Sequence, residues 1–202
     1  MGLHTSYLGH LRITPALNAD EVEFIRSFND TRHCGDDDAP LRTTQHPADD
    51  EATSGGEAYS RAAPGMPGLW CPWSCCRTGC CLHWDGVEKP YAPQEWLGYL
   101  INTFLRPRAT LRADPRARRL GLTFDHVLDG MIVGERRETG ELFALVVRDN
   151  VIRRRVLVPG AEGTDEWGYR SDDDECQSRQ DMILARRRRF EAAIAEDKQR
   201  AG

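Results

Sequence analysis

The sequence lacks the long apolar runs of a membrane protein. No window of the 202 residues approaches the roughly 18 apolar residues that a membrane-spanning helix needs. The first residues, MGLHTSYLGH, have no cationic start followed by an apolar core, which a secretory signal would show. We therefore expect a cytoplasmic protein without a membrane partner.

Signatures of the common enzyme classes are also missing. The sequence contains no G-x-S-x-G, no phosphate-binding glycine loop and no H-E-x-x-H, which are the motifs of hydrolases, nucleotide-binding proteins and zincins. No residue is marked as a nucleophile, and we expect no cofactor. These absences favour a non-enzymatic binding module with an unknown macromolecular partner over a conventional enzyme.

The chain has few aromatic residues and a net negative charge. Aromatic residues make up 8% of the chain and the mean hydropathy is -0.59, which is typical of a globular protein with much solvated chain. The net charge of -5 opposes a broad nucleic-acid-binding surface, because phosphates are neutralised by clustered lysines and arginines. A protein partner is therefore expected more than a nucleic acid.

The apolar pattern predicts an α+β domain. The alternation from Tyr7 to Ile13 predicts a strand, and the capping-box spacing of Asn18 and Glu21 predicts a helix over 19–32. A hairpin is expected from Leu69 to Asp85, because a short glycine-containing connection joins two β-compatible runs. The other predicted parts are a flexible insertion over 34–68, a helix over 93–105, strands over 120–136 and 141–158, and a polar tail over 160–202 with a helix over 175–198.

The domain is expected to span residues 1–159. Its order of elements, βαββαββ, fits a ferredoxin-like sandwich, in which two helices pack on one face of an antiparallel sheet. The insertion and the C-terminal helical tail are additions to this core.

Four segments resemble a family of uncharacterised bacterial and phage-associated proteins. They are PALNADEVEFIRSFNDTRH, PGLWCPW, HWDGVEKPYAPQEWLGYLINTFL and GELFALVVRDNVI, and the similarity covers most of residues 5–158 outside the insertion. The family pattern has PGLWCQW, then WDG-EK-Y running into EWL-YLI-FL. A more distant similarity links the chain to YubB-like ferredoxin-like domains of plasmids. The resemblance implies a ferredoxin-like fold and a mobile-element or phage origin, and it implies no activity.

Cysteine and histidine side chains gather in the predicted hairpin. Thiolate and imidazole ligands suit a tetrahedral zinc ion. The spacing C-x3-CC-x3-CC-x-H lacks paired C-x2-C motifs, and neighbouring cysteines on a strand should point to opposite faces. The family pattern has only the first of these cysteines, so small packed or exposed thiols are expected rather than a metal. The residues concerned are Cys71, Cys75, Cys76, Cys80, Cys81 and His83.

A zinc-binding or redox-active hairpin remains the alternative. A disulfide between Cys76 and Cys80, or between Cys75 and Cys81, is conceivable if the two residues lie opposite each other. In a reducing cytoplasm such a bond should be absent or regulatory.

The turn after the hairpin is the main candidate binding site. It brings carboxylates, an amine and aromatic rings to a loop between a strand and a helix, where binding residues are often found. Asp85 and Glu88 could act as an acid and base pair or bind a hard metal ion. In the simpler interpretation, Asp85 forms the turn and the rings belong to the core. The candidates are Trp73, Asp85, Glu88, Lys89 and Tyr91.

Arginines supply a second candidate surface. Beside an open sheet face with exposed aromatic rings, a basic strip would suggest binding of RNA or single-stranded DNA. The simpler interpretation is a solvated arginine-rich loop. The candidates are Arg106, Arg108, Arg112, Arg116, Arg153 and Arg155.

His126 follows Asp125 directly in the sequence. Neighbouring residues on a strand point in opposite directions, so these two should not pair with each other. An imidazole–carboxylate pair would need a partner from elsewhere in the chain.

Overall fold

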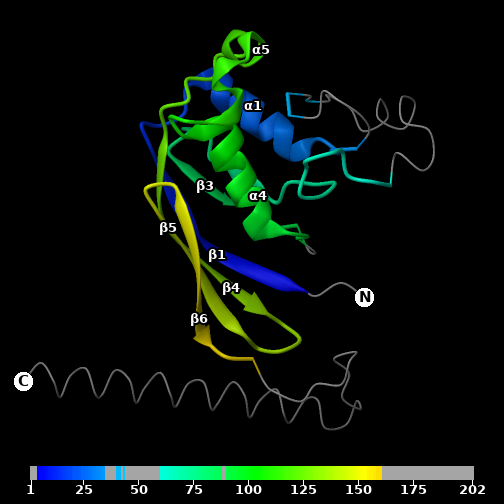
Figure 1. Cartoon of the computed structure of the whole chain (residues 1–202). Helices are drawn as coiled ribbons and strands as arrows, with labels where there is room; N and C mark the ends of the chain where they lie inside the picture. The colour runs from blue at the N-terminus through cyan, green and yellow to red at the C-terminus, as the bar shows by residue number, and fades with distance from the viewer. Residues whose placement is uncertain (1–3, 35–39, 42, 44–59, 88–89, 161–202) are drawn as a thin grey trace, which may run out of the picture. The chain divides into compact units, whose positions relative to one another are not determined.

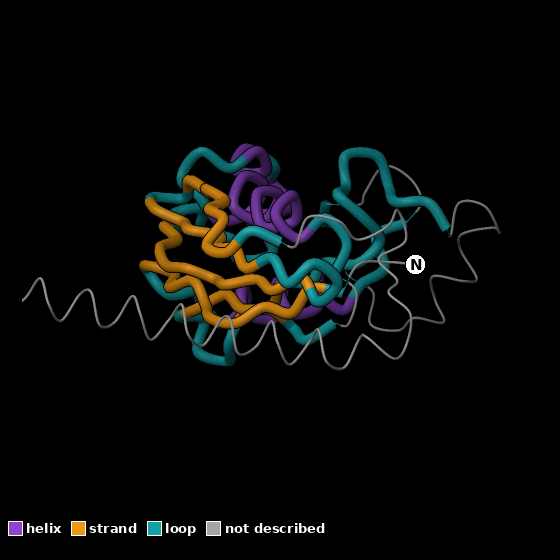
Figure 2. Tube along the Cα trace, turned by 90° about the horizontal axis from the view of Figure 1, so that it is seen from below, coloured by secondary structure: helices purple, strands orange, loops and turns teal. Residues whose placement is uncertain are grey.

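The computed structural model describes residues 4–34, 40–41, 43, 60–87 and 90–160. These form a six-stranded antiparallel sheet with the strand order β2-β3-β1-β4-β5-β6 (Figure 1). Strands and helices are distinguished by colour in Figure 2. The predicted α+β class is confirmed. Within the described residues, no helix is both long enough and apolar enough to cross a bilayer.

Strand β1 (Thr5–Thr14) lies in the middle of the sheet and pairs with β4 (Val127–Arg136) along its whole length. Its alternate residues Leu11 and Ile13 are buried, whereas Leu8 is 80% exposed. The sheet therefore has an inner face against the core and an outer face toward solvent.

Helix α1 (Ala19–Asp30) begins with the predicted capping box. The Asn18 side chain accepts from the Glu21 backbone at 2.9 Å, and the Glu21 carboxylate accepts from the Asn18 backbone at 2.9 Å. The helix ends at Asp30, two residues before the predicted end at residue 32. Its buried face contributes Phe24, Ile25 and Phe28 to the core.

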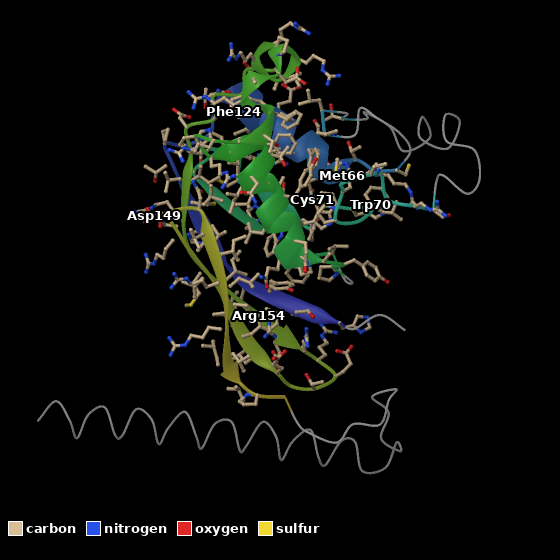
Figure 3. All side chains as sticks on the ribbon, viewed as in Figure 1. Met66, Trp70, Cys71, Phe124, Asp149 and Arg154 are labelled. Atoms are coloured by element: carbon tan, nitrogen blue, oxygen red, sulfur yellow. The ribbon has the colours of Figure 1, made fainter. Side chains whose placement is uncertain are left out.

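The predicted hairpin is confirmed, but its strands are short. β2 (Trp73–Cys75) is an edge strand and pairs with β3 (Cys81–Trp84). The residues from Leu69 to Pro72 lie outside any strand. Trp70 is 42% exposed beneath the Arg32 guanidinium, so it does not anchor the core as Trp73 does (Figure 3).

Helix α4 (Pro93–Leu100) continues into a π-helical turn (Ile101–Leu105), in which the Arg106 N–H donates to the Ile101 carbonyl. A 3-10 turn (Thr110–Ala113) and the short helix α5 (Pro115–Arg119) follow. The strand predicted from residue 120 begins only at Val127, because the intervening residues form a loop.

The segment predicted as one strand over 141–158 is two strands, β5 (Leu142–Arg148) and β6 (Val151–Val158). Asp149 and Asn150 both have positive φ, at 48° and 66°, which is the geometry of a two-residue hairpin turn. This missed turn adds a strand to the predicted order of elements. It lies at the position labelled Asp149 in Figure 3.

The core lies between the inner face of the sheet and helices α1 and α4. Trp73, Trp96 and Phe28 are fully buried in it. Ala63 and Met66 are also buried, and Cys34 forms an isolated β-bridge with Ala62. The two ends of the predicted insertion are therefore part of the folded domain. Its middle and the predicted tail helix over 175–198 lie outside the described residues.

Candidate metal centre

The turn between β2 and β3 is fixed by backbone hydrogen bonds. The Cys76 N–H donates to the Cys81 carbonyl, and the Gly79 N–H donates to the Cys76 carbonyl, both at 3.0 Å. Gly79 has a φ of 68°, and a Cβ at this position would lie 2.5 Å from the Leu17 carbonyl oxygen. This close approach is open to glycine alone. The turn is therefore packed tightly against the loop that precedes α1.

Three thiols converge on the solvent side of this turn. The Sγ atoms of Cys76, Cys80 and Cys81 all lie within 4.8 Å of one another, and those of Cys76 and Cys80 are 3.5 Å apart. The Thr78 hydroxyl lies 3.3 Å from both of these two sulfurs. Cys80 is exposed and the other two thiols are half-buried. We call Cys76, Cys80 and Cys81 the thiol triad.

The hydrogen bonds of the thiol triad favour one thiolate. Partial burial raises the pKa of Cys76, but hydrogen bonds from Thr78, Cys81 and Cys80 outweigh it and lower that pKa to about 6. Burial and the neighbouring Cys76 and Cys80 raise the pKa of Cys81 to about 12. These directions favour the thiolate form of Cys76 and the neutral thiol form of Cys81 at neutral pH.

The remaining hairpin cysteines face the opposite way. Cys71 and Cys75 are buried, and their thiols donate to the carbonyl oxygens of Trp73 and Val22. Burial raises the pKa of both thiols, that of Cys75 to about 11. Cys71 and Cys75 are therefore packed thiols, as the sequence predicted. Cys75 lies on the inner face and is paired with Leu82 across the hairpin, so the condition for a disulfide between Cys75 and Cys81, that the two lie opposite each other, is not met.

His83 does not belong to the thiol triad. Its Nδ1 lies 2.9 Å from the Trp84 carbonyl oxygen, and its Cα faces that of His10 across the β1–β3 pair. Of the six sequence candidates, the structure brings together the three cysteines of the turn. Alternation correctly separates Cys75 from Cys76, but it fails for Cys80, which precedes β3 and belongs to the turn.

The thiol triad has the dimensions of a zinc–thiolate site. Zinc–sulfur bonds of about 2.3 Å in a tetrahedron place the sulfurs about 3.8 Å apart. The observed separations, 3.5 Å for one pair and at most 4.8 Å for the others, approach this value. Three thiolates leave the fourth position open. Across the β1–β3 pair, Arg12 is the Cα partner of Cys81.

The turn after β3 does not form a common binding site with Trp73. Trp73 is fully buried, and its indole N–H donates to the Pro93 carbonyl at 2.6 Å. Asp85 accepts from the Asn29 side chain and from the Val87 backbone, both at 2.9 Å, so it ties the turn to α1. Tyr91 is 66% exposed. Glu88 and Lys89 lie outside the described residues.

The candidate arginines lie in two separate places. The first group is near α5, where Arg112 donates to the Pro107 carbonyl at 2.6 Å and Arg116 pairs with Asp114 at 3.0 Å. Arg153 and Arg155 are exposed on β6, away from α5 (Figure 1). No Phe, Tyr or Trp of the six described strands faces outward, because these rings belong to the inner face. Nucleic-acid binding stays a prediction.

A buried ion pair links α1 to the loop before β4. Glu21 is 2% exposed, and its carboxylate accepts from the Thr123 backbone, the Thr123 hydroxyl and His126 Nε2 at 2.7, 2.8 and 3.0 Å. His126 Nδ1 donates to the Pro15 carbonyl at 2.8 Å. The carboxylate partner of His126, which was expected to come from elsewhere in the chain, is therefore Glu21. In the sequence, Glu21 was recognised only as a member of the capping box.

Hydrogen bonds favour the ionised forms of both Glu21 and His126. Burial raises the pKa of Glu21, but hydrogen bonds from His126, Thr123 and Asn18 outweigh it and lower that pKa to about 2. Burial lowers the pKa of His126, but Glu21 and the Pro15 carbonyl outweigh it and raise that pKa. Since both side chains are almost inaccessible, the pair is a structural brace and not a binding site.

Comparison with known proteins gives no indication of function, so a proposal must rest on the geometry of the structure. No match was found among protein-family models, curated proteins or solved structures. The resemblance to a bacterial and phage-associated family therefore stays a prediction.

Proposed function

We propose that this protein is a non-enzymatic binding module whose thiol triad binds one thiophilic metal ion, with zinc as the representative ion. The observation that carries this proposal is the convergence of three sulfurs within 4.8 Å on a turn that backbone hydrogen bonds connect. The sequence spacing alone favoured unliganded thiols, because it did not reveal that Cys80 turns back toward Cys76 and Cys81.

We also propose that β1 to β4, with α1 and α4, form a ferredoxin-like core. The order β2-β3-β1-β4, its antiparallel neighbours, and the positions of the two helices after β1 and β3 support this topology. In this proposal β5 and β6 extend the sheet beyond β4. The metal centre then lies on the hairpin at the opposite edge.

The open fourth position suggests what the metal ion does. Structural zinc sites are closed by four protein ligands, whereas the thiol triad supplies three. A donor atom from a partner protein can complete the tetrahedron at this exposed edge hairpin. In this proposal the metal ion mediates the binding of the unknown macromolecular partner. We also propose a cytoplasmic location, because thiols stay reduced there.

Zinc affinity of the reduced full-length chain tests the proposal. Competition with a chromophoric chelator should show about one zinc ion per chain. All measurements use a Cys176→Ser background, because this cysteine lies outside the described residues and could add a ligand. Replacing Cys76, Cys80 or Cys81 by serine should each weaken binding at least about 100-fold, since even outer-shell partners commonly contribute 10–100-fold.

Cys75→Ala and Ser74→Ala are the matched controls. The first removes a neighbouring thiol that faces the core, and the second changes a side chain on the same short strand. Both should keep the zinc affinity, while circular dichroism verifies that every variant is folded. The proposal is wrong if the wild-type chain binds no zinc, or if the three triad variants bind it as tightly as the controls do.

A further inference from the structure

We propose that Cys76 and Cys80 form a reversible disulfide by exchange with a small-molecule disulfide such as glutathione disulfide, and that this bond and the metal ion exclude each other. The second half of this inference rests on the proposed metal site, whereas the first half does not. The site of modification is thus the pair of thiols that the turn brings closest together.

The geometry of the turn selects this pair. The two Sγ atoms are 3.5 Å apart, so forming a bond of about 2.05 Å requires an approach of about 1.5 Å. Both sulfurs already share the Thr78 hydroxyl at 3.3 Å, which holds their side chains toward each other. Of the three connecting residues, Arg77 and Thr78 are exposed, so they can adjust while Gly79 stays packed against Leu17.

Exposure assigns the order of the steps. Cys80 is the exposed thiol of the triad and is the one that a bulky disulfide can reach. The Cys80 thiol gives its proton to water, and its sulfur then attacks one sulfur of glutathione disulfide, whose S–S bond breaks as one glutathione thiolate leaves and takes up a proton. The Cys76 thiolate then attacks the Cys80 sulfur and displaces the second glutathione. Two protein thiols are oxidised, and one glutathione disulfide is reduced to two glutathione molecules.

The disulfide removes two of the three metal ligands. Only Cys81 would remain, and a single thiolate does not provide the three or four ligands that zinc takes in proteins. Conversely, a bound metal ion occupies the sulfur lone pairs that must attack the small disulfide. Oxidation should therefore release the ion, and the bound ion should slow oxidation.

Peptide mapping of the metal-free chain tests the disulfide by itself. The Cys176→Ser protein is equilibrated in glutathione buffers of increasing oxidised fraction, alkylated and digested with trypsin. Cleavage after Arg77 separates residues 62–77, which contain Cys76, from residues 78–108, which contain Cys80. We expect these two peptides to be linked, and the link to disappear on reduction.

Variants assign the link to the two proposed sulfurs. It should persist in Cys75→Ala and Cys81→Ser and disappear in Cys76→Ser and Cys80→Ser. The disulfide proposal is overturned if residues 62–77 and 78–108 stay unlinked in oxidising buffer, or if the link requires Cys75 or Cys81. The result does not depend on zinc, so it is independent of the proposed function.

The zinc-loaded chain tests mutual exclusion. Zinc released to a chromophoric chelator should increase in step with the linked peptides as the oxidised fraction rises, and linking should be slower than in the metal-free chain. Linked chains that retain their zinc would overturn the exclusion. A wild-type chain that binds no zinc in reducing buffer would overturn the metal site instead, whatever the peptide map shows.

Discussion

Replacing Glu21 by glutamine is expected to destabilise the fold by about 3 kcal/mol or more. Glutamine suits the same capping-box position, so the substitution removes the charge while it retains the start of α1. It leaves the buried His126 without its carboxylate, and breaking a buried ion pair typically costs about 3–5 kcal/mol. The lowering of the Glu21 pKa from 4.5 to about 2 corresponds to up to about 3 kcal/mol.

The same pair predicts how stability depends on pH. Because the Glu21 pKa is lowered on folding, its contribution is present above pH 4.5 and is lost as the pH falls toward about 2. Because the His126 pKa is raised from 6.5, its contribution is present below pH 6.5 and is lost as the pH rises through the raised value. The ion pair therefore contributes most between these two limits.

Urea unfolding of the wild type and Glu21→Gln from pH 3 to pH 9 measures this contribution. The matched control is Glu23→Gln, which changes an exposed carboxylate on the same helix. The difference in the free energy of unfolding between wild type and Glu21→Gln should be largest at about pH 5 to 6. A loss no larger than that of Glu23→Gln at every pH would refute the buried ion pair as a brace.

Three further changes have defined outcomes. Gly79→Ala should cost about 1–3 kcal/mol of stability and weaken zinc binding, because φ is positive there and a Cβ would meet a backbone carbonyl. Urea unfolding measures the loss of stability, and chelator competition measures the zinc affinity. Thr78→Val should raise the Cys76 pKa above about 6, read from the pH dependence of iodoacetamide labelling, because the hydroxyl hydrogen bond is lost. If Arg153 and Arg155 bind single-stranded nucleic acid, replacing both by alanine should lower the salt dependence of binding measured by fluorescence anisotropy. The same salt dependence in the double variant, or no binding by the wild type, would count against that surface.

Much of the fold could be predicted from local pattern. Alternation identified β1, the capping box identified the start of α1, and the glycine-containing turn identified the hairpin. The β5–β6 turn was missed because the apolar runs on its two sides read as one strand, although Asp149 and Asn150 tolerate positive φ better than most residues. Only tertiary pairing distinguishes such a turn from a continuous strand.

The candidate site was harder to predict than the fold. Strand alternation describes where Cys75 and Cys76 point, but it has no meaning for Cys80, whose direction is set by the turn conformation. That conformation depends on Gly79 and on its contact with Leu17, a residue distant in the sequence. The composition of the hairpin therefore gave a zinc-binding or redox-active site only as an alternative to unliganded thiols, whereas the convergence of three sulfurs required the folded backbone.

The number of sulfur atoms around bound zinc tests the central claim most directly. X-ray absorption spectroscopy of the zinc-loaded Cys176→Ser protein should show three sulfur ligands at about 2.3 Å and one lighter donor atom. Cys75→Ala should give the same spectrum, and Cys80→Ser should lose one sulfur or all bound zinc. Zinc that is held without sulfur, or a sulfur count that depends on Cys75 and not on Cys80, would contradict the thiol triad as the metal centre.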